Sequence, residues 1–468
     1  MNRTFNAILA VLLCTGASAA SAQMPQPVDP VTVEVAEGKL QGSREDGVLV
    51  FRGVPYAAPP TGANRWRPPQ PVEPWSGIRA ASAHEPPCVQ PVDLDTTIAN
   101  YGGVNGAQSE DCLYLTITTP QDANGAPVLV WFHGGAFFLG SGSLGSYDGR
   151  ANAREGVITV SVNYRLGALA NFVHPALAGE YTDEPKGNYA LQDSLAVLRW
   201  VAENIGAFGG DAQRVTIAGQ SAGGGIVTNL LSMPSAEGLF DKAIIQSGSI
   251  LLPDRDVSAA RDLAVTALET IGLDANASAA DLRSVSAQTF AASAELQRGF
   301  FFNRDDRFKP VSTIEALRAG TEIDVPLLVG SNEGERGFAA ARTFAQLAGD
   351  EGAPAFLYRF DYTPSFREEE WHSGPIHSAE LMFTFDSIDQ SSWGGEKANA
   401  ADRQIGHAVN DCWLAFIKMN ADARSFECAD GFVWEEYERE KAAAILDDGG
   451  FRMIAAESLP DGPAQVPQ

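Results

Sequence analysis

A serine lies in the most distinctive cluster of small residues in the chain. Gly219-Gln220-Ser221-Ala222-Gly223 follows the β-branched run VTIA and precedes the apolar run IVTNLL. A turn tight enough to project a serine between a strand and a helix needs small residues two positions before and after it, which predicts Ser221 as a nucleophile. The alternative is a glycine turn that only packs a helix on a strand. A phosphate-binding loop would need G-x-x-x-x-G-K-[ST], which follows none of the predicted strands.

A second cluster, His133-Gly134-Gly135-Ala136-Phe137, directly follows the run VLVWF. Small consecutive residues let backbone N–H groups turn toward the oxyanion of a tetrahedral intermediate in acyl transfer. The N–H groups of Gly135, Ala136 and Ala222 are therefore candidate donors. Taken alone, the cluster is equally compatible with an ordinary turn at the end of a strand.

The general base and the acid that orients it should follow the serine in the chain. Three of the six histidines do so: His372, His377 and His407. For the acid, Glu333 and its rival Glu335 both follow the run LLVG, at the end of a predicted parallel strand, where sites collect. The residues alone leave the base and the acid open.

Buried strands and helices alternate along the chain, which predicts an α/β fold. Apolar β-branched runs predict parallel strands at 128–132, 157–162, 215–218, 243–246 and 327–330. Helical spacing of leucines predicts a crossover helix between residues 191 and 205. Residues 254–296 have no strand runs and suggest a helical excursion, and the polar tail 447–468 is predicted to be frayed.

The composition of the chain and its first residues limit the partners that the protein can bind and the cellular compartment in which it can lie. The 468 residues carry 33 Lys plus Arg against 59 Asp plus Glu, a net charge of −26, which argues against nucleic acid and anionic membranes as partners. Residues 1–22 resemble a secretory signal, so we expect a periplasmic or extracellular protein without stable membrane insertion. Four cysteines remain in the exported chain, and nearness in sequence favours pairing Cys88 with Cys112 and Cys412 with Cys428.

Many separated motifs resemble the type-B carboxylesterases, which share a fold with cholinesterases and p-nitrobenzyl esterases. These motifs run in the family's order between about residues 33 and 434: FRGVPYA from Phe51, EDCLYL from Glu110, NYRLG from Asn163, GNYALQDSLAVLRWV from Gly187, FGGD from Phe208, GQSAGG, and QSG from Gln246. The resemblance implies an α/β-hydrolase fold over residues 23–468, with a largely parallel sheet, helices on both faces and a reduced helical cap region.

The resemblance also implies roles for single residues. It assigns Ser221 as the nucleophile, Glu333 as the acid, His377 as the base, and Gly135, Ala136 and Ala222 as oxyanion donors. It further implies an ion pair between Arg52 and Glu110, a position for Ser247 close to the triad, and the disulfide Cys88–Cys112.

The implied activity is hydrolysis of small-molecule carboxylic esters, without a metal or an organic cofactor. The alternatives are an amidase or acyltransferase that uses the same triad, and a non-catalytic binding protein that resembles cholinesterases. Glu333 and His377 are 44 residues apart, a shorter separation than is usual in the family, which suggests a shallower, more open site. The loop between Cys88 and Cys112 contains no Trp, which argues against a dedicated choline esterase.

Overall fold

One large twisted sheet contains strands from both ends of the described chain. The computed structural model describes residues 29–91, 107–248, 254–298, 302–305, 308–350, 352–393 and 395–462; the predicted signal segment 1–22 lies outside them. Across the sheet the strands are β1 (Asp29–Val35), β2 (Gly38–Glu45), β3 (Val48–Pro55), β5 (Tyr114–Pro120), β7 (Ile158–Val162), β6 (Ala126–Phe132), β8 (Gly210–Gln220), β9 (Lys242–Gln246), β12 (Leu327–Asn332), β13 (Ala355–Phe360), β16 (Ala442–Asp447) and β17 (Gly450–Ala455), with β4 (Ile78–Ala80) beside β2.

The centre of the sheet is parallel and its margins are antiparallel. Strands β7, β6, β8, β9, β12, β13 and β16 pair in parallel, whereas β1, β2, β3 and β5 at one margin and β17 at the other pair antiparallel, apart from the short β4, which pairs in parallel with β2. Every residue of β7 and β9 is buried, as expected for parallel strands covered on both faces. The carboxyl ends of β8 and β12 lie on the same edge, where parallel sheets place their sites.

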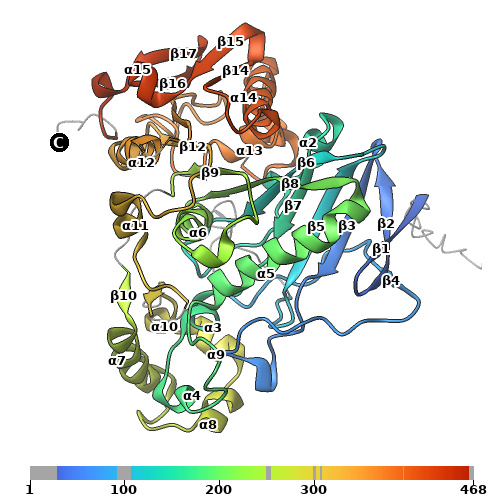
Figure 1. Ribbon diagram of the computed structural model, residues 1–468, viewed down its shortest axis with the longest axis vertical. Helices are drawn as coiled ribbons and strands as arrows, with labels where there is room; N and C mark the ends of the chain where they lie inside the picture. Colours follow the sequence, from blue (N-terminus) through green and yellow to red (C-terminus); the bar gives the residue numbers. More distant parts are fainter. Residues whose placement is uncertain are drawn as a thin grey trace, which may run out of the picture.

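Successive residues of the central strands pack into separate hydrophobic clusters on the two faces. In β6, Val128 and Val130 join one cluster, and Leu129 and Trp131 join the other. The helices α5, α6 and α12 pack on the first cluster, and α13 and α14 on the second. Figure 1 shows α5 and α6 lying across one face of the sheet.

The main helices cover the sheet or form a group at one end of the molecule. Those covering the sheet are α2 (Arg150–Arg154), α5 (Tyr189–Asn204), α6 (Ala222–Leu231), α12 (Phe338–Asp350), α13 (Leu381–Thr384), α14 (Ala400–Lys418) and α15 (Tyr437–Glu440), and α11 (Thr313–Ala319) packs against α6 and α12. The group in the lower part of Figure 1 comprises α3 (Gly167–Asn171), α4 (Pro175–Ala178), α7 (Val257–Ala267), α8 (Ala279–Ser284), α9 (Ala287–Ala292) and α10 (Ala294–Arg298).

The predicted strands and the crossover helix are present, and residues 254–296 form the expected helices α7 to α10. The prediction of a frayed tail is wrong for its first half. Residues 450–455 form β17, which pairs antiparallel with β16, and Phe451 and Met453 pack against the adjacent hydrophobic cluster. That packing holds the edge strand in place.

Two short pairs of strands lie outside the large sheet. They are β10 (Arg255–Asp256) with β11 (Asn303–Arg304), and β14 (Ser425–Cys428) with β15 (Phe432–Glu435). Cys88 is disulfide-bonded to Cys112, and Cys412 of α14 to Cys428 of β14. Within the described ranges, none of the helices is long and apolar enough to cross a membrane.

Candidate active site

Ser221 occupies a sharp turn between β8 and α6. Its backbone has φ 54° and ψ −120°, a conformation that non-glycine residues rarely adopt and that functional sites often contain. A Cβ on Gly219 would lie 2.3 Å from the carbonyl carbon of Gly223, and a Cβ on Gly223 would lie 1.9 Å from the carbonyl oxygen of Phe132, so the turn leaves no room for a side chain at either position. The Ser221 N–H donates to the Gln246 carbonyl of β9 at 2.8 Å, which fixes the turn to the next strand.

The predicted oxyanion turn packs directly against this serine. A Cβ placed on Gly134 would lie 3.3 Å from the Ser221 Cβ. The next two residues, Gly135 and Ala136, have positive φ values of 113° and 52°, and successive turns of this kind can form anion-binding concavities. Ala222 is the first residue of α6, where a backbone N–H has no partner within the helix.

His377 reaches the serine turn from a loop that precedes α13. Its Nδ1 is hydrogen-bonded to the Glu335 carboxylate, and its Nε2 lies 3.3 Å from the side-chain nitrogen of Gln220, the residue before Ser221. A proton on Nδ1 therefore leaves Nε2 as an acceptor on the serine side. Burial lowers the pKa of His377, but the hydrogen bond and charge of Glu335, together with the charge of Glu380, raise it more, and the net pKa is above its ordinary value.

The carboxylate that contacts His377 is that of Glu335, and not that of Glu333, the predicted acid. The Glu333 side chain is 38% exposed and lies 3.8 Å from the Arg359 guanidinium. The Glu335 side chain is only 12% exposed, accepts the Asn332 N–H at 2.9 Å, and accepts a hydrogen bond from the Ser247 hydroxyl. Ser247 thus lies next to the Glu335–His377 pair.

The position of the turn explains why Glu333 is displaced from the histidine. β12 ends at Asn332, and the N–H of Glu333 still donates to the Phe360 carbonyl of β13, at 2.9 Å. The chain turns only after that point, and the turn brings Glu335 back so that its carboxylate bonds the Asn332 N–H. The sequence offers both glutamates as candidates, and only the direction of the turn determines which of them contacts His377.

A second buried carboxylate, which sequence reasoning missed, lies near Glu335 and His377. Glu380 has no exposed surface and accepts hydrogen bonds from the amides of Asn332 at 2.6 Å and Gln246 at 3.3 Å. Burial, and then the charge of Glu335, raise the pKa of Glu380 to about 7. In the sequence, only its position three residues after His377 indicates that Glu380 lies close to that histidine.

The other histidines occupy different surroundings. His133 is buried, its Nδ1–H donates to the Gly134 carbonyl at 2.7 Å, and burial lowers its pKa to about 4. His372 is exposed, and His407 pairs with Asp386 on the surface of α14. Among the three candidate bases, His377 alone contacts the serine turn through a described hydrogen bond.

The implied ion pair between Arg52 and Glu110 is also corrected. Arg52 bonds Glu45 of the neighbouring strand β2 through two contacts of 2.5 and 2.7 Å. Glu110 instead binds Arg65, again through two contacts, at 2.6 and 2.5 Å.

The sequence profile of the carboxylesterase family matches residues 29–351. The chain belongs to the carboxylesterase family. The para-nitrobenzyl esterase of Bacillus subtilis (strain 168) is 32% identical over 478 aligned positions, which cover 88% of this chain and 93% of the relative. The fumonisin B1 esterase of Sphingopyxis macrogoltabida is 36% identical over 322 positions, 66% of this chain and 57% of that protein.

Solved structures of esterases share the whole architecture. A PNB esterase superposes with a TM-score of 0.78 at 29% identity, covering 90% of this chain and 96% of the other. The Geobacillus stearothermophilus carboxylesterase EST55 gives a TM-score of 0.77 at 30% identity, covering 90% and 97%. The fold is therefore that of the α/β-hydrolases, and the protein is a carboxylic ester hydrolase that acts on small-molecule esters.

Proposed function

We propose that the esterase works through an acyl-enzyme on Ser221, with His377 as the general base and acid and Glu335 as its orienting carboxylate. The observation that carries the proposal is the continuous chain of contacts from Glu335 through the His377 ring to the turn that presents Ser221. It keeps the predicted nucleophile and base and replaces the predicted acid Glu333 with its neighbour.

Hydrolysis then takes two matched steps. His377 Nε2 takes the Ser221 proton as the hydroxyl oxygen bonds to the ester carbonyl carbon, and it returns that proton to the departing alkoxide. Water attacks the acyl-enzyme in the same way and releases the carboxylic acid. The N–H groups of Gly135, Ala136 and Ala222 stabilise the oxyanion in both steps.

A fluorophosphonate probe tests the nucleophile directly. We expect peptide mass spectrometry to locate the label on Ser221, and Ser221→Ala to take no label while keeping its circular dichroism spectrum. Label on another residue, or a folded wild-type protein that stays unlabelled, would contradict the proposal. Comparing an ester with its matched anilide then separates esterase from amidase chemistry.

The site is proposed to be open enough for bulky esters. Between Glu335 and His377 the described chain forms only α12, β13 and a stretch of turns at 361–376, so a single helix lies within this segment. We expect p-nitrophenyl esters with branched or aromatic acyl groups to react with kcat/KM comparable to the butyrate. Strict preference for the acetate would contradict an open site.

Export to an oxidising compartment is proposed from the signal-like residues 1–22 together with two disulfides that join residues near in sequence. Expression with the full leader, followed by N-terminal sequencing of the mature chain, should show Gln23 as the first residue. A mature protein that still begins with Met1 would contradict export through this leader.

A further inference from the structure

The loop that carries two of the proposed oxyanion donors is shaped by its own backbone hydrogen bonds. The Gly135 carbonyl accepts the N–H groups of Phe138 at 3.1 Å and Leu139 at 2.8 Å. This carbonyl and the Ala136 N–H belong to one planar trans peptide unit, in which they point in opposite directions. The direction of the Ala136 N–H therefore depends on where Phe138 and Leu139 hold the Gly135 carbonyl.

The residue after Leu139, Gly140, packs closely against the beginning of the same loop. A Cβ placed on Gly140 would lie 2.3 Å from His133 Nδ1 and 2.6 Å from the Gly134 carbonyl oxygen. His133 is itself held in place, because its carbonyl accepts the Tyr164 hydroxyl at 2.7 Å. A displacement of Gly140 would thus be transmitted both to Leu139 and to the residues at the start of the loop.

One side chain from a distant part of the chain, that of Gln90, binds both backbone polar groups of Gly140. The Gly140 N–H donates to Gln90 Oε1 at 3.0 Å, and the Gly140 carbonyl accepts from Gln90 Nε2 at 3.0 Å. The same amide nitrogen also donates to the Cys88 carbonyl at 3.0 Å. The oxygen and the nitrogen of this amide therefore fix the position of Gly140 together.

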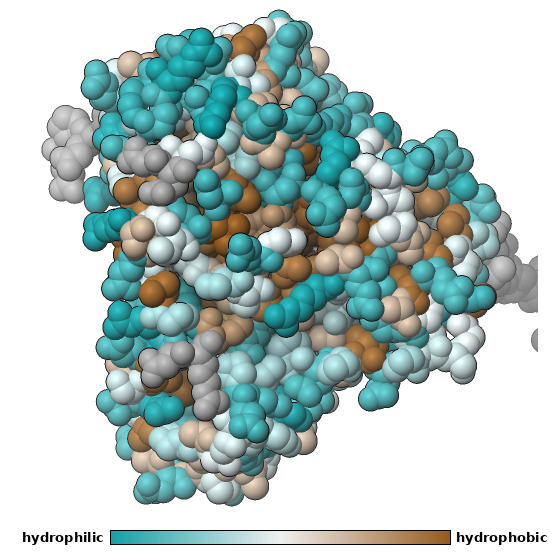
Figure 2. All heavy atoms as spheres, viewed as in Figure 1, coloured by the Kyte–Doolittle hydropathy of each residue, from teal (hydrophilic) through white to brown (hydrophobic). Residues whose placement is uncertain are grey.

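Gln90 is completely buried and its backbone is anchored. Glutamine is usually found at the surface, and Figure 2 shows hydrophilic side chains predominating along the rim of the face in view. The Gln90 N–H donates to the Gln108 side chain at 2.9 Å, its carbonyl accepts from Gln288 at 3.3 Å, and the disulfide between Cys88 and Cys112 lies two residues away. The anchored amide can therefore hold the loop, because a buried amide that loses its hydrogen bonds costs free energy.

We propose that Gln90 is a positioning residue for ester hydrolysis, which holds the loop 133–140 so that the N–H groups of Gly135 and Ala136 are directed at the oxyanion. Gln90 acts through Gly140 and not by contact with the reacting atoms. Donors that are fixed before the reaction need no reorganisation when the oxyanion forms. This inference rests on the proposed function, because it requires an oxyanion formed by attack of Ser221.

Gln90→Met tests this role, because methionine is similar in length to glutamine but has no amide. We expect kcat/KM for p-nitrophenyl butyrate to fall about 10- to 100-fold. The inhibition constant of a trifluoromethyl ketone, which forms a tetrahedral oxyanion with an active serine, should rise by about the same factor. A variant that has only lost part of its folded population keeps the wild-type inhibition constant, and that result would overturn the proposal.

Gln90→Asn is a milder second variant, which carries the test if Gln90→Met does not fold. It keeps the amide but is one carbon shorter, so it cannot reach both groups of Gly140 where they now lie. We expect kcat/KM to fall about tenfold and the inhibition constant to rise to match.

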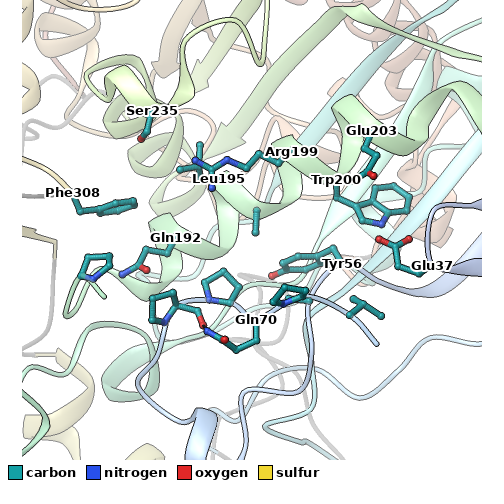
Figure 3. Close-up of a pocket in the computed structure, with 17 residues that line it drawn as sticks. Glu37, Tyr56, Gln70, Gln192, Leu195, Arg199, Trp200, Glu203, Ser235 and Phe308 are labelled. Carbon is teal, nitrogen blue, oxygen red and sulfur yellow. Dashed lines mark hydrogen bonds between the residues drawn. The ribbon is translucent and has the colours of Figure 1, made fainter. Parts of the chain in front are cut away.

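Gln192→Met is the matched control. Gln192 of α5 is also buried, donates to the Gly187 carbonyl at 2.6 Å, and lines the pocket shown in Figure 3, which contains no residue of the loop 133–140. We expect wild-type kcat/KM and a wild-type inhibition constant. Equal changes in the Gln90 and Gln192 variants would indicate a general effect of losing a buried amide and would overturn the proposal.

Fluorophosphonate labelling separates this inference from the proposed function. If wild-type Ser221 takes no label, the proposed function and the role of Gln90 are both overturned. If Ser221 is labelled and the folded Gln90 variants keep wild-type kcat/KM, only the role of Gln90 is overturned.

Discussion

Two glutamates two residues apart offer a direct test of the triad at the level of single residues. Glu335→Gln removes the charge that orients His377 and stabilises its imidazolium, so kcat should fall about 10³- to 10⁴-fold. Glu333→Gln, the matched control, changes only a half-exposed group beside Arg359 and should leave kcat close to the wild-type value. Both are measured with p-nitrophenyl butyrate. The reverse pattern would restore Glu333 as the acid.

The acidity of His377 should set the acid limb of the pH profile. Because its pKa is raised, the imidazole stays protonated, and inactive as a base, to a higher pH than an isolated histidine does. The kcat/KM profile should therefore fall on acidification with a midpoint above about 6.5. A midpoint clearly below that value would show that burial outweighs the neighbouring carboxylates.

Gln220 offers a way to move that midpoint. Its side-chain nitrogen lies 3.3 Å from His377 Nε2, so Gln220→Glu places a negative charge beside the imidazole and should raise the midpoint by about 1 pH unit. Gln213→Glu adds the same charge at the exposed start of β8 and should leave the profile in place. Two profiles that shift equally would indicate a general effect of charge instead.

At the scale of elements, the hydrophobic pattern of the sequence predicted the strands that are buried on both faces. It did not predict the edge strand β17 or the geometry of the turn after β12. The runs VLVWF and VITVSV are buried on both faces as β6 and β7, so their composition suffices to identify them. β17 was not predicted because it lies at the sheet margin, where its residues are only partly buried or exposed. The choice between Glu333 and Glu335 likewise depended on where one turn begins, and no periodicity encodes that.

The disulfide between α14 and β14 should contribute measurably to stability. It closes a loop with a sequence separation of 16 residues, and a loop of this size restricts the unfolded chain by about 3 kcal/mol. Cys412→Ala with Cys428→Ala should lower the free energy of unfolding in urea by about that amount, while kcat stays near wild type. An unchanged unfolding midpoint would mean that α14 and β14 are held by packing alone.

At the scale of the whole molecule, a net charge of −26 should select among substrates before they reach Ser221. A surface this acidic lowers the local concentration of anions, and salt screens the effect over a Debye length of about 10 Å at 0.1 M. The p-nitrophenyl monoester of glutaric acid should therefore show a kcat/KM that rises with added sodium chloride. The neutral p-nitrophenyl valerate, of similar length, is the control and should show no rise. If both substrates respond alike, the salt acts on the enzyme itself, and the surface charge has no part in substrate selection.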